Sequence, residues 1–97
     1  METAKLSGLL GMANRARKIL YGDTAFEALK GPKAALLLIS SDASDRTMKQ
    51  LINRSEHYNV KYRVIDDVLL NQAVGKTTAK TALIIDHGFS KGILDNM

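Results

Sequence analysis

Helical and strand patterns alternate along the 97 residues of this chain, which predicts an α/β fold with a sheet covered by helices on both faces. Two patterns lead to this prediction. Residues 34–39 are apolar at consecutive positions, as expected of a central strand that is buried on both sides. The apolar residues at the i, i+3, i+4 and i+7 positions, which form one buried face of a helix, are Leu6, Leu9, Leu10 and Ala13. We expect residues 1–97 to form a single domain.

The segments before the central strand predict two helices and a short strand. The first helix is expected to end at the basic stretch 14–18, and residues 19–21 form a strand-like run that Gly22 stops. Asp23 or Thr24 is then expected to cap a second helix, because short polar side chains accept hydrogen bonds from N–H groups of a first turn. The apolar face of this helix is predicted to contain Ala25, Phe26 and Leu29.

Three helices and two strands are predicted after the central strand. The polar stretch 40–45 supplies capping groups for a third helix that closes near Asn59 and buries Met48, Leu51 and Ile52. Residues 60–64 alternate apolar and basic side chains, which predicts a strand with one solvent-exposed face. Asp66 or Asp67 then caps a helix over residues 68–74, which Gly75 ends; residues 81–85 form a fourth, buried strand before a last helix with Phe89, Ile93 and Leu94 inward.

The composition limits the compartment and the partner. The chain has no cysteine, which excludes disulfides and thiolate metal sites and suits a reducing compartment. The N-terminus lacks a signal-peptide pattern, and the longest apolar run is far shorter than the ~20 residues that span a bilayer. We therefore expect a cytoplasmic protein without a membrane partner. A net charge of +4 favours a polyanionic partner such as nucleic acid.

No pattern indicates catalysis, a cofactor or a metal site. Residues 75–77 read Gly-Lys-Thr, but Leu70 stands where a phosphate-binding loop requires glycine, and a helix is predicted where that loop requires a strand. His57 and His87 are isolated, each without a second ligand at helical metal spacing. Four of the ten acidic residues, Asp42, Asp45, Asp66 and Asp67, lie at predicted helix starts, where they stabilise the helix dipole. We expect no enzyme and no cofactor.

Two segments have the chemistry to contact RNA. Gly22 opens a helix soon after two cations, and the free N–H groups of a helix start attract anions. The acidic Asp23 favours base reading there, since a carboxylate accepts hydrogen bonds from a guanine edge. Residues 75–80 carry two lysines and two hydroxyls, which suit phosphate and sugar oxygens. Ordinary helix capping and a solvated connection are the alternative explanations.

A set of motifs extends over most of the chain, from Leu9 to Ile93. They are residues 9–18 (Leu-Leu-Gly-Met-Ala-Asn-Arg-Ala-Arg-Lys), Gly22-Asp23, residues 41–44 (Ser-Asp-Ala-Ser), residues 58–60 (Tyr-Asn-Val), residues 74–76 (Val-Gly-Lys) and residues 86–89 (Asp-His-Gly-Phe). Through these motifs the chain resembles the kink-turn-binding ribosomal-protein superfamily, specifically its small bacterial YlxQ-like branch. The resemblance implies a three-layer α-β-α sandwich with a four-stranded mixed sheet.

The same resemblance implies an RNA surface formed by the start of the second helix and the loop after the fourth. In the wider family the helix start contacts the edges of G·A pairs at a sharply bent internal loop, and an apolar loop packs on flipped-out nucleotides. By analogy, two cations would hold phosphate, the helix start would face bases, Val74 would press on an unstacked nucleotide, and the polar loop would contact the backbone. The residues expected to contact RNA are Arg17, Lys18, Gly22, Asp23, Thr24, Val74, Gly75, Lys76, Thr77, Thr78 and Lys80.

The chain departs from the family at the helix start. Positions that hold Asn, Glu and Lys in the wider family hold Thr24, Ala25 and Ala28 here, which predicts weaker or altered RNA binding. We expect a monomer that binds structured RNA, an rRNA or mRNA kink-turn, in association with the ribosome or translation. The alternative is a protein–protein interaction module of the same fold. The RNA hypothesis requires that the segments near residues 22 and 76 lie side by side as one positively biased surface.

Overall fold

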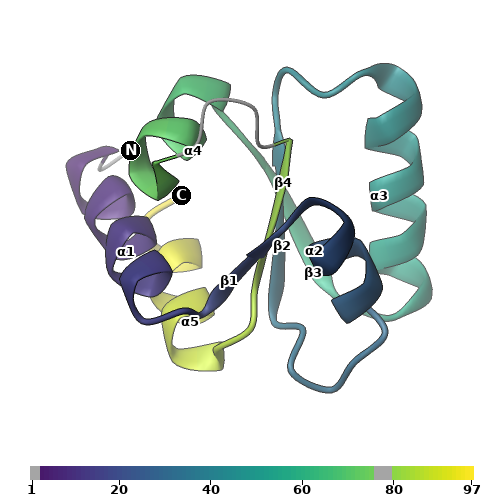
Figure 1. The fold of residues 1–97 in the computed structure, drawn as a ribbon, viewed down its shortest axis with the longest axis horizontal. Coiled ribbons are helices and arrows are strands. Elements are labelled where there is room, and N and C mark those ends of the chain that lie inside the picture. Colours follow the sequence, from purple (N-terminus) through teal and green to yellow (C-terminus); the bar gives the residue numbers. More distant parts are fainter. Residues whose placement is uncertain (1–2, 76–79) are drawn as a thin grey trace.

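The computed structural model describes residues 3–75 and 80–97, and within these ranges five helices and four strands form three layers (Figure 1). Helices α1, α4 and α5 cover one face of the sheet, and α2 and α3 cover the other. The elements are α1 (Thr3–Arg15), β1 (Ile19–Tyr21), α2 (Gly22–Ala28), β2 (Leu36–Ser40), α3 (Asp45–His57), β3 (Lys61–Ile65), α4 (Asp67–Val74), β4 (Thr81–Ile84) and α5 (His87–Asp95). The expected α-β-α sandwich is confirmed.

The sheet is mixed, with the strand order β1-β4-β2-β3. β2 and β3 are parallel, whereas β4 is antiparallel to both of its neighbours, β1 and β2. The two interior strands, β2 and β4, are buried along their whole length. Since successive strand residues point to opposite faces, a strand covered on both sides must be apolar at nearly every position. This requirement explains the continuous apolar runs of the sequence.

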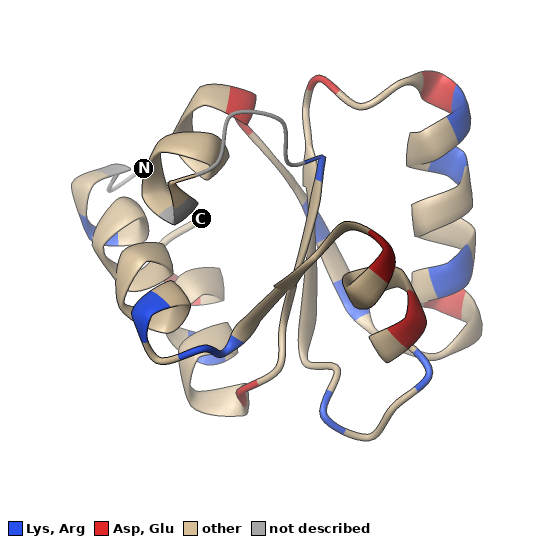
Figure 2. Cartoon of the chain, viewed as in Figure 1, with Lys and Arg blue, Asp and Glu red and all other residues tan. Residues whose placement is uncertain are grey.

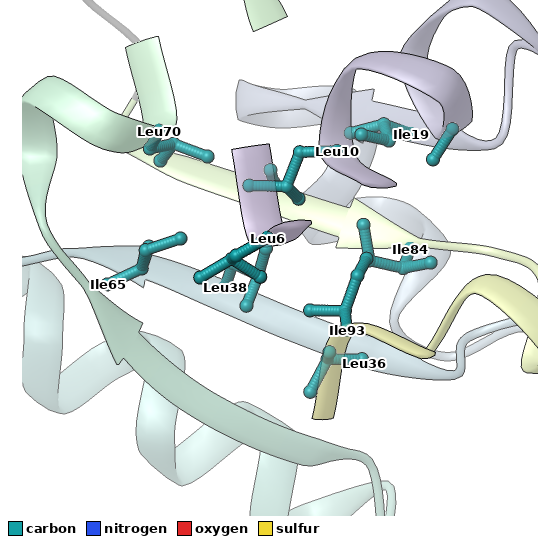
Figure 3. Close-up of a cluster of buried hydrophobic side chains, with 11 residues drawn as sticks. Leu6, Leu10, Ile19, Leu36, Leu38, Ile65, Leu70, Ile84 and Ile93 are labelled. Carbon is teal, nitrogen blue, oxygen red and sulfur yellow. The ribbon is translucent and has the colours of Figure 1, made fainter. Parts of the chain in front are cut away.

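Two apolar clusters lie on the two faces of the sheet. In the larger one, Leu6 and Leu10 of α1 and Ile93 of α5 pack on Leu36 and Leu38 of β2 (Figure 3). The smaller cluster fills the space under α2 and α3 with Ala25, Leu29, Leu37, Ile39, Leu51, Val60 and Leu83. The helix faces predicted from periodicity are therefore the faces that the helices bury.

The strand β3 differs from its predicted pattern at one position. Val60 and Tyr62 pack in the cluster beneath α3, as their alternation predicts. Val64, however, is 48% exposed, although the alternation placed it on the same buried face. β3 is an edge strand, and the packing of α3 against the sheet includes its first half but not Val64.

The helix α2 begins without the side-chain cap that the sequence predicted. The residue at the N-cap position is Tyr21, whose side chain makes no capping hydrogen bond, so neither Asp23 nor Thr24 caps this helix. Gly22 has φ +55°, a left-handed value, and turns the chain from β1 directly into α2. This turn leaves no residue between strand and helix, which places Asp23 within the first turn, where its charge favours the helix dipole.

Two helices end in the same hydrogen-bonded motif. At the end of α1, the Arg17 N–H donates to the Asn14 carbonyl (3.0 Å) and the Lys18 N–H to the Ala13 carbonyl (2.8 Å), which is the Schellman pattern. Arg17 occupies the left-handed position of this motif, with φ +59°. Asn59 takes the corresponding position after α3, with φ +57°.

A polar network closes the carboxyl end of the central strands. The buried Ser40 hydroxyl donates to Asp67 Oδ1 (2.5 Å), and the Ser40 N–H donates to the Lys80 carbonyl (2.9 Å). The Lys80 ammonium contacts Asp42 Oδ2 at 2.7 Å and Asp67 Oδ1 at 3.5 Å. The Ser40 hydrogen bond, and then the Lys80 charge, hold the pKa of Asp67 below its ordinary value, although partial burial opposes them. The network thereby connects β2, α4 and the residue that precedes β4.

We expect Arg17→Gly to raise the free energy of unfolding by about 0.5–1 kcal/mol, because glycine adopts the left-handed conformation without the steric cost that arginine carries. Asn59→Gly should change it less, since asparagine tolerates this conformation. Urea unfolding of the two variants and the wild type measures both effects. A larger gain from Asn59→Gly than from Arg17→Gly would contradict this interpretation.

We expect the stabilising contribution of the Asp67 carboxylate to depend on pH. Its folded-state pKa lies below the ordinary value of 3.8, so the unfolded chain binds the proton more readily. The contribution is therefore present above that value and lost as the pH falls through the folded-state pKa. The stability difference between wild type and Asp67→Asn should narrow in urea unfolding as the pH is lowered to about 3, and Ser40→Ala should weaken this dependence. A difference that widens toward acid would refute the assignment.

Candidate nucleic-acid interface

The strand register brings together two segments that are far apart in the sequence. β1 pairs with β4 so that Tyr21 lies opposite Ala82. Gly22 follows Tyr21, and Lys80 lies two residues before Ala82, so the start of α2 and the approach to β4 are at the same end of the sheet (Figure 1). Lys80, the described end of the second segment, is therefore near the start of α2, whereas residue 76 lies outside the described residues.

The first turn of α2 is the exposed part of this end. Gly22, Asp23 and Thr24 are exposed, whereas Ala25 is fully buried and Ala28 is half-buried. Of the three positions at which the chain departs from the wider family, Thr24 is therefore open to solvent, and the Ala25 methyl belongs to the core. The surface that the first turn of α2 offers consists of a glycine, a carboxylate and a hydroxyl.

The rest of α2 is fixed against its neighbour. The Arg54 guanidinium of α3 lies 4.1 Å from the centre of the Phe26 ring, a cation–π contact. Glu27 and Lys30 form an exposed ion pair at 3.0 Å, which lowers the pKa of Glu27. The Phe26–Arg54 contact joins α2 to α3, whereas the exposed ion pair is local to the end of α2.

The structure describes the two ends of the second segment predicted to contact RNA, Gly75 and Lys80. Gly75 ends α4 with φ +72° and is exposed, and its N–H donates to the Asn71 carbonyl. Lys76, Thr77 and Thr78 lie outside the described residues, and the Val74 side chain also falls outside them. Lys80 is the next described residue and directly precedes β4.

The Lys80 side chain has partners that the sequence analysis missed. The prediction assigned its charge to an RNA backbone, but the ammonium is held by the carboxylates of Asp42 and Asp67, and the hydrogen bond to Asp42 chiefly raises the pKa of Lys80. These partners are 38 and 13 residues away in the sequence. A signal existed, since each aspartate lies three residues after the end of a segment predicted as a strand, and the ends of neighbouring parallel strands meet at one edge.

Arg17 and Lys18 lie at the other end of β1, away from Gly22. The Lys18 carbonyl accepts a hydrogen bond from the Ile85 N–H (2.9 Å), which places Lys18 beside the end of β4, not its beginning. The three extended residues of β1 separate these cations from the helix start by roughly 10 Å. The expectation that they reinforce the anion affinity of the α2 start is corrected, because β1 carries the chain across the sheet between them.

The described residues around the α2 start carry more carboxylates than free cations. Asp23, Asp42, Asp66 and Asp67 lie on α2, on the turn after β2 and at the start of α4, and Figure 2 shows acidic residues at these places. Lys80 stands among them, already paired with two of the carboxylates. The positive bias expected of this end is therefore absent from its described residues.

Tyr21 connects this end to α1. Its hydroxyl donates to Asn14 Oδ1, and partial burial raises the pKa of the phenol. The contact joins the last residue of β1 to the last turn of α1. It helps to fix the point at which the chain turns into α2.

No cluster of three or more metal-binding side chains occurs among residues 3–75 and 80–97. None of the helices in this described part of the chain has the length and apolarity to cross a membrane.

Comparison with known proteins gives a consistent family. The sequence profile of the ribosomal protein L7Ae/L30e/S12e/Gadd45 family matches residues 4–94. The RNA-binding protein YlxQ of Bacillus subtilis (strain 168) is 32% identical over 88 residues, which cover 89% of this chain and 88% of the relative. The RNA-binding protein YlxQ of Enterococcus faecium is 32% identical over 89 residues, or 90% of this chain and 85% of that protein. None of these descriptions names an enzyme, in agreement with the expectation from the sequence.

Solved structures share the fold. A protein of unknown function from Bacillus halodurans C superposes with a TM-score of 0.88 at 32% identity, with 95% of each chain covered. The 15.5kD RNA binding protein of Giardia lamblia superposes with a TM-score of 0.76 at 21% identity, over 98% of this chain and 84% of that one. The chain belongs to the ribosomal protein L7Ae/L30e/S12e/Gadd45 family, in its YlxQ-like branch.

Proposed function

We propose that this chain is a single RNA-binding domain that recognises structured, kink-turn-like RNA in the cytoplasm, in association with the ribosome or translation. The observation that carries the proposal is the β1–β4 register, which sets the exposed turn of Gly22, Asp23 and Thr24 at the same end of the sheet as Lys80, the described end of the second predicted segment. These are the two segments that the family resemblance assigns to RNA. The names of the YlxQ relatives support RNA as the partner.

The chemistry of the exposed turn favours base edges over phosphate. The Asp23 carboxylate repels phosphate, but it accepts hydrogen bonds from the N–H groups of a guanine edge, and the Thr24 hydroxyl both donates and accepts. The bases of a regular A-form helix are not accessible through its deep, narrow major groove, whereas bent or unpaired regions expose them. A turn with this composition therefore has suitable partners in a kinked RNA and few in a straight duplex.

One observation favours the alternative, a protein–protein interaction module. The described surface around Gly22 carries more carboxylates than free cations, which lowers its general affinity for a polyanion. The exposed large apolar side chains that such a module would use are spread over different segments: Met12, Tyr58, Val64, Val68 and Met97. The RNA proposal has the stronger support because the neighbouring segments match the family's RNA surface.

The proposal is tested with two RNAs of equal length and charge, one with a kink-turn and one an unkinked duplex, titrated over a series of salt concentrations. We expect tighter binding to the kinked RNA at every salt concentration, by about tenfold or more, because base contacts add to a charge-dependent term that both RNAs share. Equal affinities with equal salt slopes would remove the specific claim. Absence of binding to both RNAs would favour the interaction module.

We expect Asp23→Ala to lower the preference for the kinked RNA by about tenfold, because it removes an acceptor for base edges while it reduces repulsion from the duplex. Glu27→Ala is the matched control, since it removes one carboxylate from the same helix at a position already paired with Lys30. Its preference should equal that of the wild type in the same titration. Loss of preference in both variants would assign the effect to net charge.

A further inference from the structure

A groove lies at the end of the sheet opposite to the α2 start. Its volume is about 560 Å³, and its lining includes Lys61 and Arg63 of β3, Lys91 of α5, and Ala35, just before β2. Ala35 is at the amino end of β2, whereas Lys80 is hydrogen-bonded to Ser40 at the carboxyl end. The five residues of β2, about 16 Å of extended chain, separate this groove from the proposed base-reading surface.

The strand geometry brings the cations of the groove together. Lys61 and Arg63 are two residues apart on β3, so their side chains leave the same face of the sheet. That face is the one covered by α5, which carries Lys91. β3 is an edge strand, and both side chains are exposed.

The cations of the groove outnumber its carboxylates within the described residues. Lys61, Arg63 and Lys91 form no ion pair there, unlike Lys80, and the groove lining includes the carboxylate of Asp95. Arg63 Nη1 donates to the carbonyl of Tyr62 (2.7 Å), which leaves the other guanidinium N–H groups available. The groove therefore offers three cationic side chains against one carboxylate.

Further cations lie at this end of the sheet. The end of β4 is flanked on one side by Ala35, whose N–H donates to the Ile84 carbonyl (2.9 Å). On the other side it is flanked by Lys18, whose carbonyl accepts from the Ile85 N–H (2.9 Å). Arg17 and Lys18 thus extend the positive charge from the groove across the sheet end. Figure 2 shows basic residues on β3 and at the junction of α1 and β1.

We infer that this groove binds the phosphate backbone of an RNA segment distinct from the segment read at the start of α2. The inference rests on the proposed function for its choice of RNA as the polyanion. Lys61 and Arg63 are roughly 7 Å apart along the strand, close to the separation of successive phosphates on a nucleic-acid strand. Exposed lysine and arginine side chains at this spacing suit phosphate oxygens and carry no base readout. The end with carboxylates reads bases, and the opposite end supplies charge-dependent affinity.

The variant that tests the groove is Arg63→Gln/Lys91→Gln, which removes two exposed cations from two different elements. Its matched control is Arg46→Gln/Lys49→Gln, which also removes one arginine and one lysine, both exposed on α3 outside the groove. The isotope-labelled protein is first saturated with a minimal kink-turn RNA, and single-stranded oligouridylate is then titrated at low salt. Amide chemical shifts report the position of binding, and resonances outside the groove report that each variant is folded.

We expect oligouridylate to shift the amides of Lys61, Arg63 and Lys91 in the wild type and in the control variant. The groove variant should bind oligouridylate about tenfold more weakly, with a salt slope flatter by roughly 1.4 units, the value for two phosphate contacts to a single strand. Shifts confined to other surfaces, or equal weakening in groove variant and control, would overturn the inference.

Two further titrations test the choice of RNA as the ligand of the groove and separate this inference from the proposed function. Polyglutamate at the same charge concentration should shift the groove amides less than oligouridylate does, and equal shifts would overturn the assignment to RNA. Oligouridylate is also titrated into the protein without kink-turn RNA. Loss of preference for kinked RNA with the groove response intact would refute the proposed function alone, and loss of the groove response with preference intact would refute this inference alone.

Discussion

The arrangement of the molecule depends on the pairing of β4 between β1 and β2. All four residues of β4 are buried, and the pairs Ile19↔Ile84 and Tyr21↔Ala82 fix its direction and register relative to β1. A shift by one residue would turn every buried side chain of the strand to the opposite face, so the register is strongly specified. Because β4 is antiparallel, its beginning meets the start of α2 and its end meets Lys18. The positions of both surfaces follow from this one constraint.

The same pairing separates the charges of the chain into two ends. At the beginning of β4, Asp42 and Asp67 neutralise Lys80, and the first turn of α2 adds Asp23. At the opposite end, the cations of β3 and α5 have no carboxylate partner among the described residues. A modest net charge of +4 therefore conceals an uneven distribution. Composition alone indicates a polyanionic partner but does not indicate which end meets it.

Most of the fold was predictable because its signals are local. Apolar patterns and capping residues located the described helices and strands. Gly75 ends α4 as predicted, and the polar stretch 40–45 contains the residue that caps α3, Ser44. The family resemblance predicted that the start of α2 lies near the segment that contains Lys80. The β1–β4 register places Gly22 and Lys80 at the same end of the sheet. Periodicity failed at Val64 because the extent to which α3 covers an edge strand is a tertiary property.

The errors in the predicted surface have a common physical origin. Lys18 is only four residues before Gly22, but an extended strand places near sequence neighbours far apart. Lys80 is far from Asp42 in the sequence, but the sheet brings the two side chains into contact. Reasoning from sequence proximity therefore placed the charge of Lys18 beside Gly22, where it does not lie. The same reasoning missed the carboxylates that neutralise Lys80. Such effects depend on strand direction and order, which the apolar pattern does not encode.

This distribution of charge also bears on the family positions at which the chain departs. Ala25 is part of the core, and its neighbour Asp23 presents the only carboxylate of the first turn of α2. A turn with this composition contributes hydrogen bonds but little long-range attraction, so its contacts gain their energy only when bases are already exposed. Attraction over longer distances must come from cations elsewhere, and the described cations without carboxylate partners include those at the far end of the sheet. In the proposed arrangement, electrostatic capture and base discrimination are therefore carried by different ends of one small domain. This division keeps the phosphates that bind the cations away from the carboxylate that would repel them.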